Sequence, residues 1–397
     1  MKINERIYVW YRIICAKLFS CLYYCFRIIP IRKNQIVFSN FEGKQGYGDN
    51  PKAIAEKIFE MYGTRKYKMI WLVNDNKKCF PDYIKIVKNG ILRRAYYLST
   101  SRIWIDNHRK KLEVRKRKGQ LYIATWHGMI GFKKVGALRG EELPKIAELV
   151  SRHDSELADI FLSNSLWCEK TIKKAFFYNG EILRTGSPRC DICINIENEK
   201  RRKLLESYGL DYNCRYIMYA PTFRGYKQNI HMNMNEHEGE IEYENLCAAL
   251  KERFGGEWKI LYRSHPGIAK EDILSKNASD VVDVSGYDDM YSIMACCDAF
   301  ISDYSSCVFD ASAMKIPVFL LVDDYDEYAE KRGILWDLDK LPFPYAKNNN
   351  ELIEKIIKFD DKKYMQELNE LFKGVELLED GRGSERVVNY IDEWSVR

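Results

Sequence analysis

Two histidines directly follow apolar, β-like stretches of the sequence. His127 comes after Leu121–Thr125 and precedes Gly128, and His265 comes after Trp258–Arg263 and precedes a proline. Side chains just beyond the end of a strand lie at the edge of a sheet, where α/β proteins bind ligands. An imidazole at that edge could take a proton from an attacking hydroxyl. The spacing therefore predicts a catalytic base, although a histidine that only completes a turn fits it as well.

Cationic and hydroxyl side chains occupy equivalent places elsewhere in the chain. Arginine can bind a phosphate with two parallel hydrogen bonds, and the start of a helix offers free backbone N–H groups to an anion. We therefore expect the cleft to bind a phosphorylated donor. The residues expected to contact its phosphates are Thr222, Arg224, Arg263, Ser302, Asp303, Ser305 and Ser306. These segments also have purely structural interpretations. They could form a surface turn or cap a helix. In the segment Gly186–Asp191, Arg189 could simply pair with Asp191.

The elements that must position these side chains alternate between β-like and helical stretches. Strands separated by helices indicate parallel βαβ units. We therefore predict two doubly wound, Rossmann-like α/β domains that face each other across a cleft, spanning residues 34–195 and 196–397. The expected strands are Gln35–Ser39, Tyr67–Val73, Ile84–Val87, Ile103–Asp106, Leu121–Thr125, Asp159–Ser163, Gly180–Arg184, Tyr216–Ala220, Trp258–Arg263, Val281–Asp283, Ala299–Ser302 and Val318–Val322.

The composition is that of a globular protein with ample core-forming content. The chain has 397 residues, of which 46% are hydrophobic and 30% charged, and this balance argues against a disordered chain. Its 12 cysteines show no zinc-site spacing, so we expect free, reduced thiols. No dinucleotide-binding glycine motif or P-loop is complete. The sequence indicates no metal site and no particular cofactor. A divalent cation bound to a donor pyrophosphate remains an alternative.

Residues 1–33 form a basic, amphipathic segment. They hold seven basic side chains and one acidic one, so the whole formal net charge of +6 lies here. The longest uncharged stretch is too short to span a bilayer. An apolar stripe recurs at helical spacing, and it suits either the anionic surface of a membrane or the protein's own core. The stripe consists of Ile3, Ile7, Trp10, Ile14, Leu18, Cys21 and Cys25.

A second basic cluster, residues 109–118, precedes the strand that leads to His127. Three interpretations remain open for it: a solvated loop, a contact with an acceptor diphosphate or anionic lipid, and nucleic acid. Nucleic acid is the least favoured, because the chain outside residues 1–33 carries no net charge.

Together these segments resemble the CDP-glycerol glycerophosphotransferases of teichoic acid and capsule synthesis. The resemblance covers roughly residues 35–340, and its combination of motifs is more specific than any one of them. The matching stretches are Asp49–Lys52, Tyr122–Gly128 with Lys133, Gly186–Asp191, Ala220–Arg224, Arg263–Pro266, Ile301–Asp310, Lys315–Pro317 and Asp326–Tyr328.

The resemblance implies a GT-B-like enzyme, peripheral on the cytoplasmic face of the membrane. It would transfer glycerol phosphate from CDP-glycerol to a polyprenyl-diphosphate-linked saccharide and release CMP. His127 matches the family's proposed general base, and His265 matches a histidine that contacts the donor pyrophosphate. The N-terminal domain would bind the acceptor and the C-terminal domain the CDP-alcohol. On the acceptor side we expect Trp126, Gly128, Lys133, Asn50 and Arg189.

Two departures from the family pattern stand out. Met129 follows Gly128 where the family often has threonine, and residues 225–240, with His231 and His237, match nothing in it. CDP-ribitol or another CDP-polyol, and priming or polymerising activity, all remain open. The rival functions are a GT-B glycosyltransferase that uses a nucleotide sugar and a non-catalytic protein that binds membrane or nucleic acid.

Overall fold

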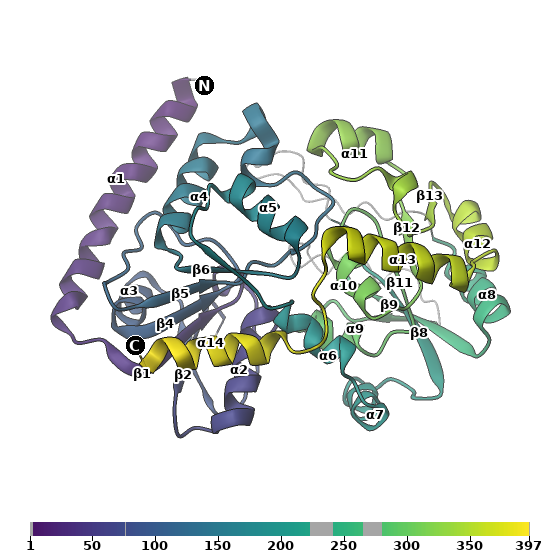
Figure 1. Cartoon of the computed structure of the whole chain (residues 1–397), viewed down its shortest axis with the longest axis horizontal. Helices are drawn as coiled ribbons and strands as arrows, with labels where there is room; N and C mark the ends of the chain where they lie inside the picture. Colours follow the sequence, from purple (N-terminus) through teal and green to yellow (C-terminus); the bar gives the residue numbers. More distant parts are fainter. Residues whose placement is uncertain (1–2, 76, 223–240, 265–279, 397) are drawn as a thin grey trace. The chain divides into compact units, whose positions relative to one another are not determined.

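The computed structural model describes residues 3–75, 77–222, 241–264 and 280–396. The chain divides into two compact units (Figure 1). Unit 1 comprises Met1–Met129, Val135–Asp191 and Leu378–Arg397, and unit 2 comprises Ile130–Lys134 and Ile192–Leu377.

Unit 1 is built on a seven-stranded parallel sheet in the order β3-β2-β1-β4-β5-β6-β7. The inner strands are almost wholly buried apolar runs, as expected of a parallel sheet that helices cover on both faces. The order reverses between β1 and β4, where Val37 pairs with Ile70 of β2 on one side and with Trp104 of β4 on the other. The strands are β1 (Arg32–Ser39), β2 (Lys68–Val73), β3 (Ile84–Lys88), β4 (Ser101–Asp106), β5 (Leu121–Ala124), β6 (Ile160–Ser163) and β7 (Glu181–Arg184).

Helices connect these strands and cover the sheet (Figure 1). The α-helices of unit 1 are α1 (Ile3–Cys25), α2 (Asp49–Tyr62), α3 (Ile91–Thr100), α4 (Lys145–Leu157), α5 (Leu166–Phe176) and α14 (Gly383–Val396). Short 3-10 turns are η1 (Phe26–Ile28), η2 (Phe41–Gly43), η3 (Gly136–Glu142) and η4 (Pro188–Cys190).

Unit 2 repeats the same strand order in a six-stranded parallel sheet, β10-β9-β8-β11-β12-β13. The order reverses between β8 and β11. The strands are β8 (Cys214–Tyr219), β9 (Glu257–Tyr262), β10 (Val281–Asp283), β11 (Ala299–Ser302), β12 (Val318–Leu321) and β13 (Tyr345–Ala346). The helices are α6 (Asp191–Ile194), which begins at the last residue of unit 1, α7 (Asn198–Ser207), α8 (Tyr243–Phe254), α9 (Met290–Met294), α10 (Cys307–Ala313), α11 (Tyr325–Arg332), η5 (Leu338–Lys340), α12 (Asn349–Ile357) and α13 (Asp361–Val375).

The prediction of an α/β fold with parallel sheets is confirmed, and each expected strand overlaps an observed one. The limits of the units differ from the expected ones: residues 1–33 are part of unit 1, Ile130–Lys134 belongs to unit 2, and unit 2 resumes at Ile192 rather than at residue 196. The predicted second domain ran to residue 397, whereas Leu378–Arg397 belongs to unit 1. In α14, Val387, Val388 and Ile391 are buried in the core of unit 1.

A carboxylate anchors this returning helix. Asp392 accepts hydrogen bonds from Tyr67 Oη at 2.8 Å and Lys66 Nζ at 2.7 Å, and also from the Tyr62 hydroxyl. These partners lie more than 300 residues away in the sequence, so no local sequence pattern could predict the pairing.

Helix α1 packs one face against α3 and α4 and turns the other away from unit 1. Tyr23 is fully buried, together with Val9, Ala16 and Ser20. The predicted apolar stripe is on the opposite face, where Trp10 and Leu18 are each 66% exposed. Ile7 and Ile14 are exposed as well, and so are Cys21 and Cys25. The stripe therefore does not pack on the described part of the fold, and the own-core alternative is wrong for it.

The basic segment 109–118 is not a solvated loop. Lys110 is buried in an ion pair with Asp106, and the Lys116 ammonium lies 2.5 Å from a carboxylate oxygen of Asp159. Arg117 donates to the carbonyls of Ile29 (2.7 Å), Ser99 (3.0 Å) and Arg27 (3.2 Å). The segment thus ties the end of α1 to the sheet, which leaves few of its charges for an acceptor or for nucleic acid.

Candidate active site

In unit 1, the loops that follow the two central strands are joined by a pair of asparagines. Asn107, after β4, donates from Nδ2 to Oδ1 of Asn40, after β1, at 2.7 Å. Its own Oδ1 accepts the backbone N–H of Phe41 at 2.8 Å. Both asparagines are fully buried. They join the loops on either side of the reversal of strand order, which is where doubly wound sheets bind their ligands.

His127 lies beside these loops, in the loop after β5. Its Nδ1 is 2.8 Å from the backbone oxygen of Asn107. Because a carbonyl oxygen can only accept, Nδ1 carries the proton and Nε2 presents a lone pair. The ring is half-buried, between Trp126 (ring centroids 4.1 Å apart) and Phe41 (4.7 Å). The predicted imidazole at a strand end is therefore neither sealed in the core nor free to rotate.

The surroundings of His127 favour the neutral ring. Burial lowers the pKa of His127 to about 3, and the positive charges of the nearby His108, Arg189 and Arg109 act in the same direction. The hydrogen bond to Asn107 opposes them. The ring is consequently unprotonated at neutral pH, as a general base must be.

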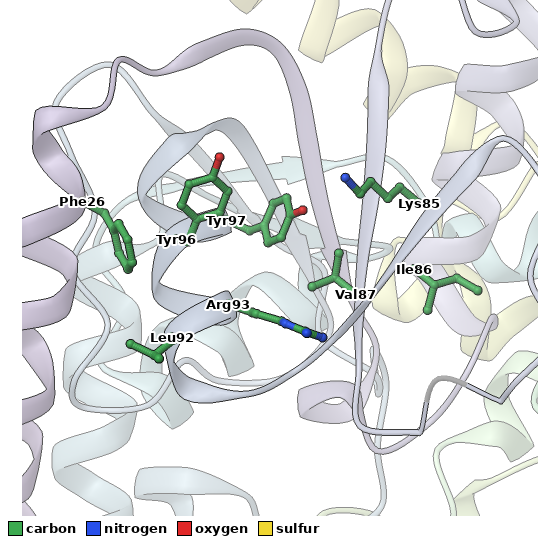
Figure 2. Close-up of a pocket in the computed structure, with 8 residues that line it drawn as sticks. All are labelled: Phe26, Lys85, Ile86, Val87, Leu92, Arg93, Tyr96 and Tyr97. Atoms are coloured by element: carbon green, nitrogen blue, oxygen red, sulfur yellow. The ribbon is translucent and has the colours of Figure 1, made fainter.

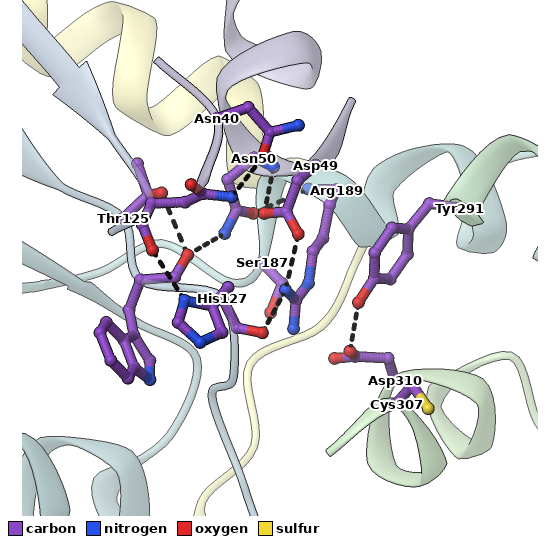
Figure 3. Close-up of polar contacts among 12 residues, drawn as sticks. Asn40, Asp49, Asn50, Thr125, His127, Ser187, Arg189, Tyr291, Cys307 and Asp310 are labelled. Atoms are coloured by element: carbon purple, nitrogen blue, oxygen red, sulfur yellow. Dashed lines mark hydrogen bonds and ion pairs between the residues drawn. The ribbon is translucent and has the colours of Figure 1, made fainter. Parts of the chain in front are cut away.

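Two buried side chains and a half-buried carboxylate fix the loop that carries His127 (Figure 3). Asn50 donates from Nδ2 to the carbonyl of Trp126 at 3.0 Å and accepts the N–H of Arg189 at 3.1 Å. The Arg189 guanidinium donates to the carbonyl of His127 at 2.7 Å and to Asp49 at 3.1 Å. Burial raises the pKa of Asp49, and the charge of Arg189 opposes that rise. This support matters because Trp126 has a φ of 54°, a left-handed value that is costly for a bulky residue.

The expected acceptor-side residues therefore occupy several kinds of position. Asn50 and Arg189 are buried beneath the His127 loop, and Arg189 pairs with Asp49 rather than with Asp191. Asp191 instead accepts the N–H groups of Gly383 and Ser384 at the start of α14. Trp126 is buried beside His127, and Gly128 is half-buried.

Lys133 belongs to unit 2, where it forms an antiparallel bridge with Ile334. It is thus not among the unit 1 residues that surround His127.

A second histidine and a carboxylate lie beside His127, and sequence reasoning missed both. His108 stacks parallel to His127 with 5.9 Å between ring centroids. Glu42 faces His108 Nδ1 at 3.4 Å and Lys111 Nζ at 3.8 Å. Burial alone would raise the pKa of Glu42, but the hydrogen bond to His108 and the nearby charges, which include those of Lys111 and Lys44, lower it to about 2. Because His108 follows β4 closely, the strand-end rule that identified His127 would also have found His108.

The Gly186–Ser187 turn is held by the C-terminal return of the chain. Glu379 accepts from Ser187 N at 3.1 Å, from its hydroxyl at 2.5 Å and from Asn164 Nδ2 at 2.9 Å. Gly186 has a φ of 86°, and a Cβ there would lie 2.9 Å from the carbonyl oxygen of Leu378. The glycine is therefore required for the close approach of this segment, which sequence reasoning also missed.

Unit 2 has the same kind of link between its two central strands. Asp303, after β11, accepts the Thr222 N–H at 2.9 and 3.0 Å and also the Thr222 hydroxyl, after β8. Ser302 donates to the carbonyl of Ala220 at 2.6 Å. All three predicted residues are buried, and they join the ends of the two central strands of unit 2.

The remaining described donor-side residues differ in their exposure. Arg263 is buried and donates to the carbonyl of Val284 at 2.8 Å, and burial lowers its pKa. Ser305 and Ser306 are partly exposed before α10. The Ser305 hydroxyl lies 2.9 Å from Cys307 Sγ. Arg224, His265, His231 and His237 lie outside the described residues.

Comparison with known proteins decides the family. Residues 21–393 match the family model described as CDP-Glycerol:Poly(glycerophosphate) glycerophosphotransferase. The chain belongs to this glycerophosphotransferase family. The resemblance inferred from the motifs is thus confirmed, and so is the expectation of a transferase of phosphorus-containing groups.

Members of the family that resemble this glycerophosphotransferase differ in length and in polyol. The chain is 25% identical to the teichoic acid poly(glycerol phosphate) polymerase of Bacillus spizizenii strain W23, over 97% of this chain and 98% of that one. It is 27% identical to the polymerase of the same description from Bacillus subtilis strain 168, over 95% of this chain but only 51% of that protein. It is 26% identical to the teichoic acid poly(ribitol-phosphate) polymerase of Bacillus spizizenii, over 95% of this chain and 59% of that one.

A solved structure shares the fold of this glycerophosphotransferase. The structure of the wall teichoic acid polymerase TagF matches it with a TM-score of 0.79 and 25% identity, over 100% of this chain and 98% of that one.

Proposed function

We propose that the protein transfers glycerol phosphate from CDP-glycerol to a hydroxyl of a polyprenyl-diphosphate-linked saccharide, with His127 as the general base. The observation that carries the proposal is the state of His127: a neutral, half-buried ring whose Nδ1 is held by Asn107, which leaves the Nε2 lone pair to accept a proton.

The acceptor hydroxyl attacks the phosphorus that bears the glycerol. A bond forms between the acceptor oxygen and that phosphorus, while the bond from phosphorus to the bridging oxygen of CMP breaks. Nε2 of His127 takes the hydroxyl proton, and the resulting imidazolium is stabilised by the carbonyl of Asn107 on Nδ1. Transfers of this kind depend mainly on positioning and fixed charge. The buried Asn50–Arg189–Asp49 support under the His127 loop supplies the positioning.

The donor is proposed to bind unit 2. The Thr222–Asp303 link fixes the strand ends at the reversal of strand order, and the partly exposed Ser305 and Ser306 adjoin it. Arg224 and His265 keep their predicted roles on the donor phosphates. In the GT-B-like arrangement that we propose, the crevices of the two units face one cleft.

The protein is further proposed to lie on the cytoplasmic face of the membrane through α1. The exposed stripe includes Trp10 and Leu18, and the segment carries the whole net charge of the chain. By length and composition, Glu5–Ile28 could also cross a membrane, so the sequence argument from its longest uncharged stretch does not exclude a span. The packing of its other face on α3 and α4 favours a helix that lies along the surface.

The test is release of CMP by the full chain, with a lipid-linked saccharide acceptor and a panel of donors: CDP-glycerol, CDP-ribitol and nucleotide sugars. We expect CMP only from a CDP-polyol, and loss of that activity in His127→Gln with unchanged circular dichroism. Release of a nucleoside diphosphate from a nucleotide sugar, measured in the same panel, would instead identify a glycosyltransferase. An unaffected His127→Gln variant would show that His127 is not the base.

CDP-ribitol is the second candidate donor, because the relatives include a poly(ribitol-phosphate) polymerase. The same panel separates the two polyols.

A further inference from the structure

A pocket opens at the end of α1, apart from the strand ends that carry His127 (Figure 2). It has a volume of about 460 Å³, within the range of small-molecule sites. Its walls come from η1, β3 and α3, all in unit 1. The lining residues are Phe26, Lys85, Ile86, Val87, Leu92, Arg93, Tyr96 and Tyr97.

The pocket combines cations with aromatic walls. Phe26 meets Tyr96 edge to face with 5.5 Å between ring centroids, and Lys85 Nζ lies 6.0 Å from the ring of Tyr97. Arg93 forms no ion pair or hydrogen bond with any residue in the part of the chain that the structure describes. The Arg32 guanidinium packs on Tyr96 at 5.4 Å beside the pocket.

The elements around the pocket carry an excess of basic side chains. Strands β1 and β3, turn η1 and helix α3 contain no aspartate or glutamate. They carry Arg27, Arg32, Lys33, Lys85, Lys88, Arg93 and Arg94, of which Arg94 is paired with Glu113. The pocket is therefore an electropositive site for an anion, and its apolar walls suit a ligand that carries more than a bare phosphate.

Exposed apolar side chains surround this site. Ile28 is 89% exposed, Leu92 58% and Tyr24 50%, and the exposed stripe of α1 ends beside them. A water-soluble anion would make no contact with these apolar side chains. A membrane lipid, in contrast, carries its phosphate next to its apolar chains and could contact both.

We propose that this pocket binds the phosphate-bearing headgroup of an anionic glycerophospholipid. Lys85 and Arg93 contact the phosphate, the tyrosines line the glycerol moiety, and the acyl chains run past Leu92 and Ile28 toward the stripe of α1. The proposal rests on the membrane attachment proposed above, and it adds a preference for one lipid class at a defined place.

The first experiment measures acylation of individual lysines by mass spectrometry on the full chain. Vesicles of phosphatidylcholine, with and without phosphatidylglycerol, are compared with inorganic phosphate alone. We expect phosphatidylglycerol vesicles to protect Lys85 but not Lys88, an exposed lysine on the same strand outside the pocket. Protection of Lys85 by inorganic phosphate alone, or equal protection of both lysines, would overturn the proposal.

The second experiment compares two double variants that remove the same charge. We expect Lys85→Gln with Arg93→Gln to weaken binding to phosphatidylglycerol vesicles about 30-fold, from the loss of two cations at an anionic surface. The control, Lys88→Gln with Arg65→Gln, removes two exposed cations outside the pocket and should weaken binding clearly less. Equal losses would reduce the site to general attraction between charges and refute the pocket.

Failure of the pocket and failure of membrane attachment are distinguishable. If the wild-type chain binds no vesicle of either composition, attachment itself is wrong and the pocket falls with it. If the chain binds and both double variants weaken binding equally, attachment stands and only the headgroup site is refuted.

Discussion

The protonation state of His127 gives the sharpest prediction. A histidine with the ordinary pKa of about 6.5 is about 90% protonated at pH 5.5. Burial lowers the pKa of His127 to about 3, so in the folded protein its ring should remain almost wholly neutral at that pH. Nuclear magnetic resonance of the chain labelled at histidine Cε1 tests this directly, with His127→Gln to assign the signal.

The same shift has a consequence for stability, and its sign is defined. Because the pKa is lower in the folded state, the unfolded chain takes up the proton first as the pH falls. Folding is therefore weakened progressively from about pH 6.5 down to about pH 3, and by pH 5 His127 should account for about 2 kcal/mol of the loss. Urea unfolding of the wild type at pH 7 and pH 5 should show this loss, and His127→Gln should lack that part of it.

A control variant tests the cause of the shift. His108→Gln removes a ring whose charge lowers the pKa of His127, so it should raise that pKa. A His127 signal that titrates near pH 6.5 would refute the reasoning, because it would mean that the ring is solvated and not buried.

Three further outcomes follow from the contacts described. Asn50→Ala leaves the Trp126 carbonyl and the Arg189 N–H without their partner and should lower the free energy of unfolding by about 2–4 kcal/mol, measured by urea unfolding, together with a loss of CMP release. Thr222→Val removes a hydroxyl bond to the buried Asp303 and should cost about 1–3 kcal/mol in the same assay, whereas Thr222→Ser should cost clearly less; equal losses would contradict the role of the hydroxyl. Trp10→Ser with Leu18→Ser should leave the melting temperature unchanged, because both side chains are exposed. It should weaken vesicle binding more than tenfold, since each apolar side chain removed from the membrane costs about 1.5 kcal/mol or more. Unchanged co-sedimentation with vesicles would argue against the stripe as the attachment surface.

The strands could be predicted because each buried parallel strand is a short apolar run, and Val281–Asp283 and Ala299–Ser302 match the observed limits. Strand β13 was not predicted, because a strand of two residues is too short to show an apolar pattern. The return of α14 to unit 1 was not predicted either, because Asp392, which anchors the helix, binds residues that are far away in the sequence.

The site was predictable to the extent that chemistry follows strand ends. His127 was found in this way, and His108 could have been. The part played by Arg189 was not predictable, because an arginine in a turn looks the same in the sequence whether it awaits a phosphate or, as here, supports a carbonyl and pairs with Asp49. The role of the basic cluster 109–118 could not be predicted for the same reason. The carboxylate and the carbonyl that bind Lys116 and Arg117 belong to distant segments of the chain.

The central claim is that the Nε2 lone pair of His127 receives the acceptor's proton. Its most direct test is chemical rescue of His127→Gly, with CMP release from CDP-glycerol measured as imidazole is added. The account predicts an inactive variant whose activity rises with the concentration of neutral imidazole, while CDP-glycerol binding is unchanged. A His127→Gly variant that releases CMP at the wild-type rate without imidazole would contradict it.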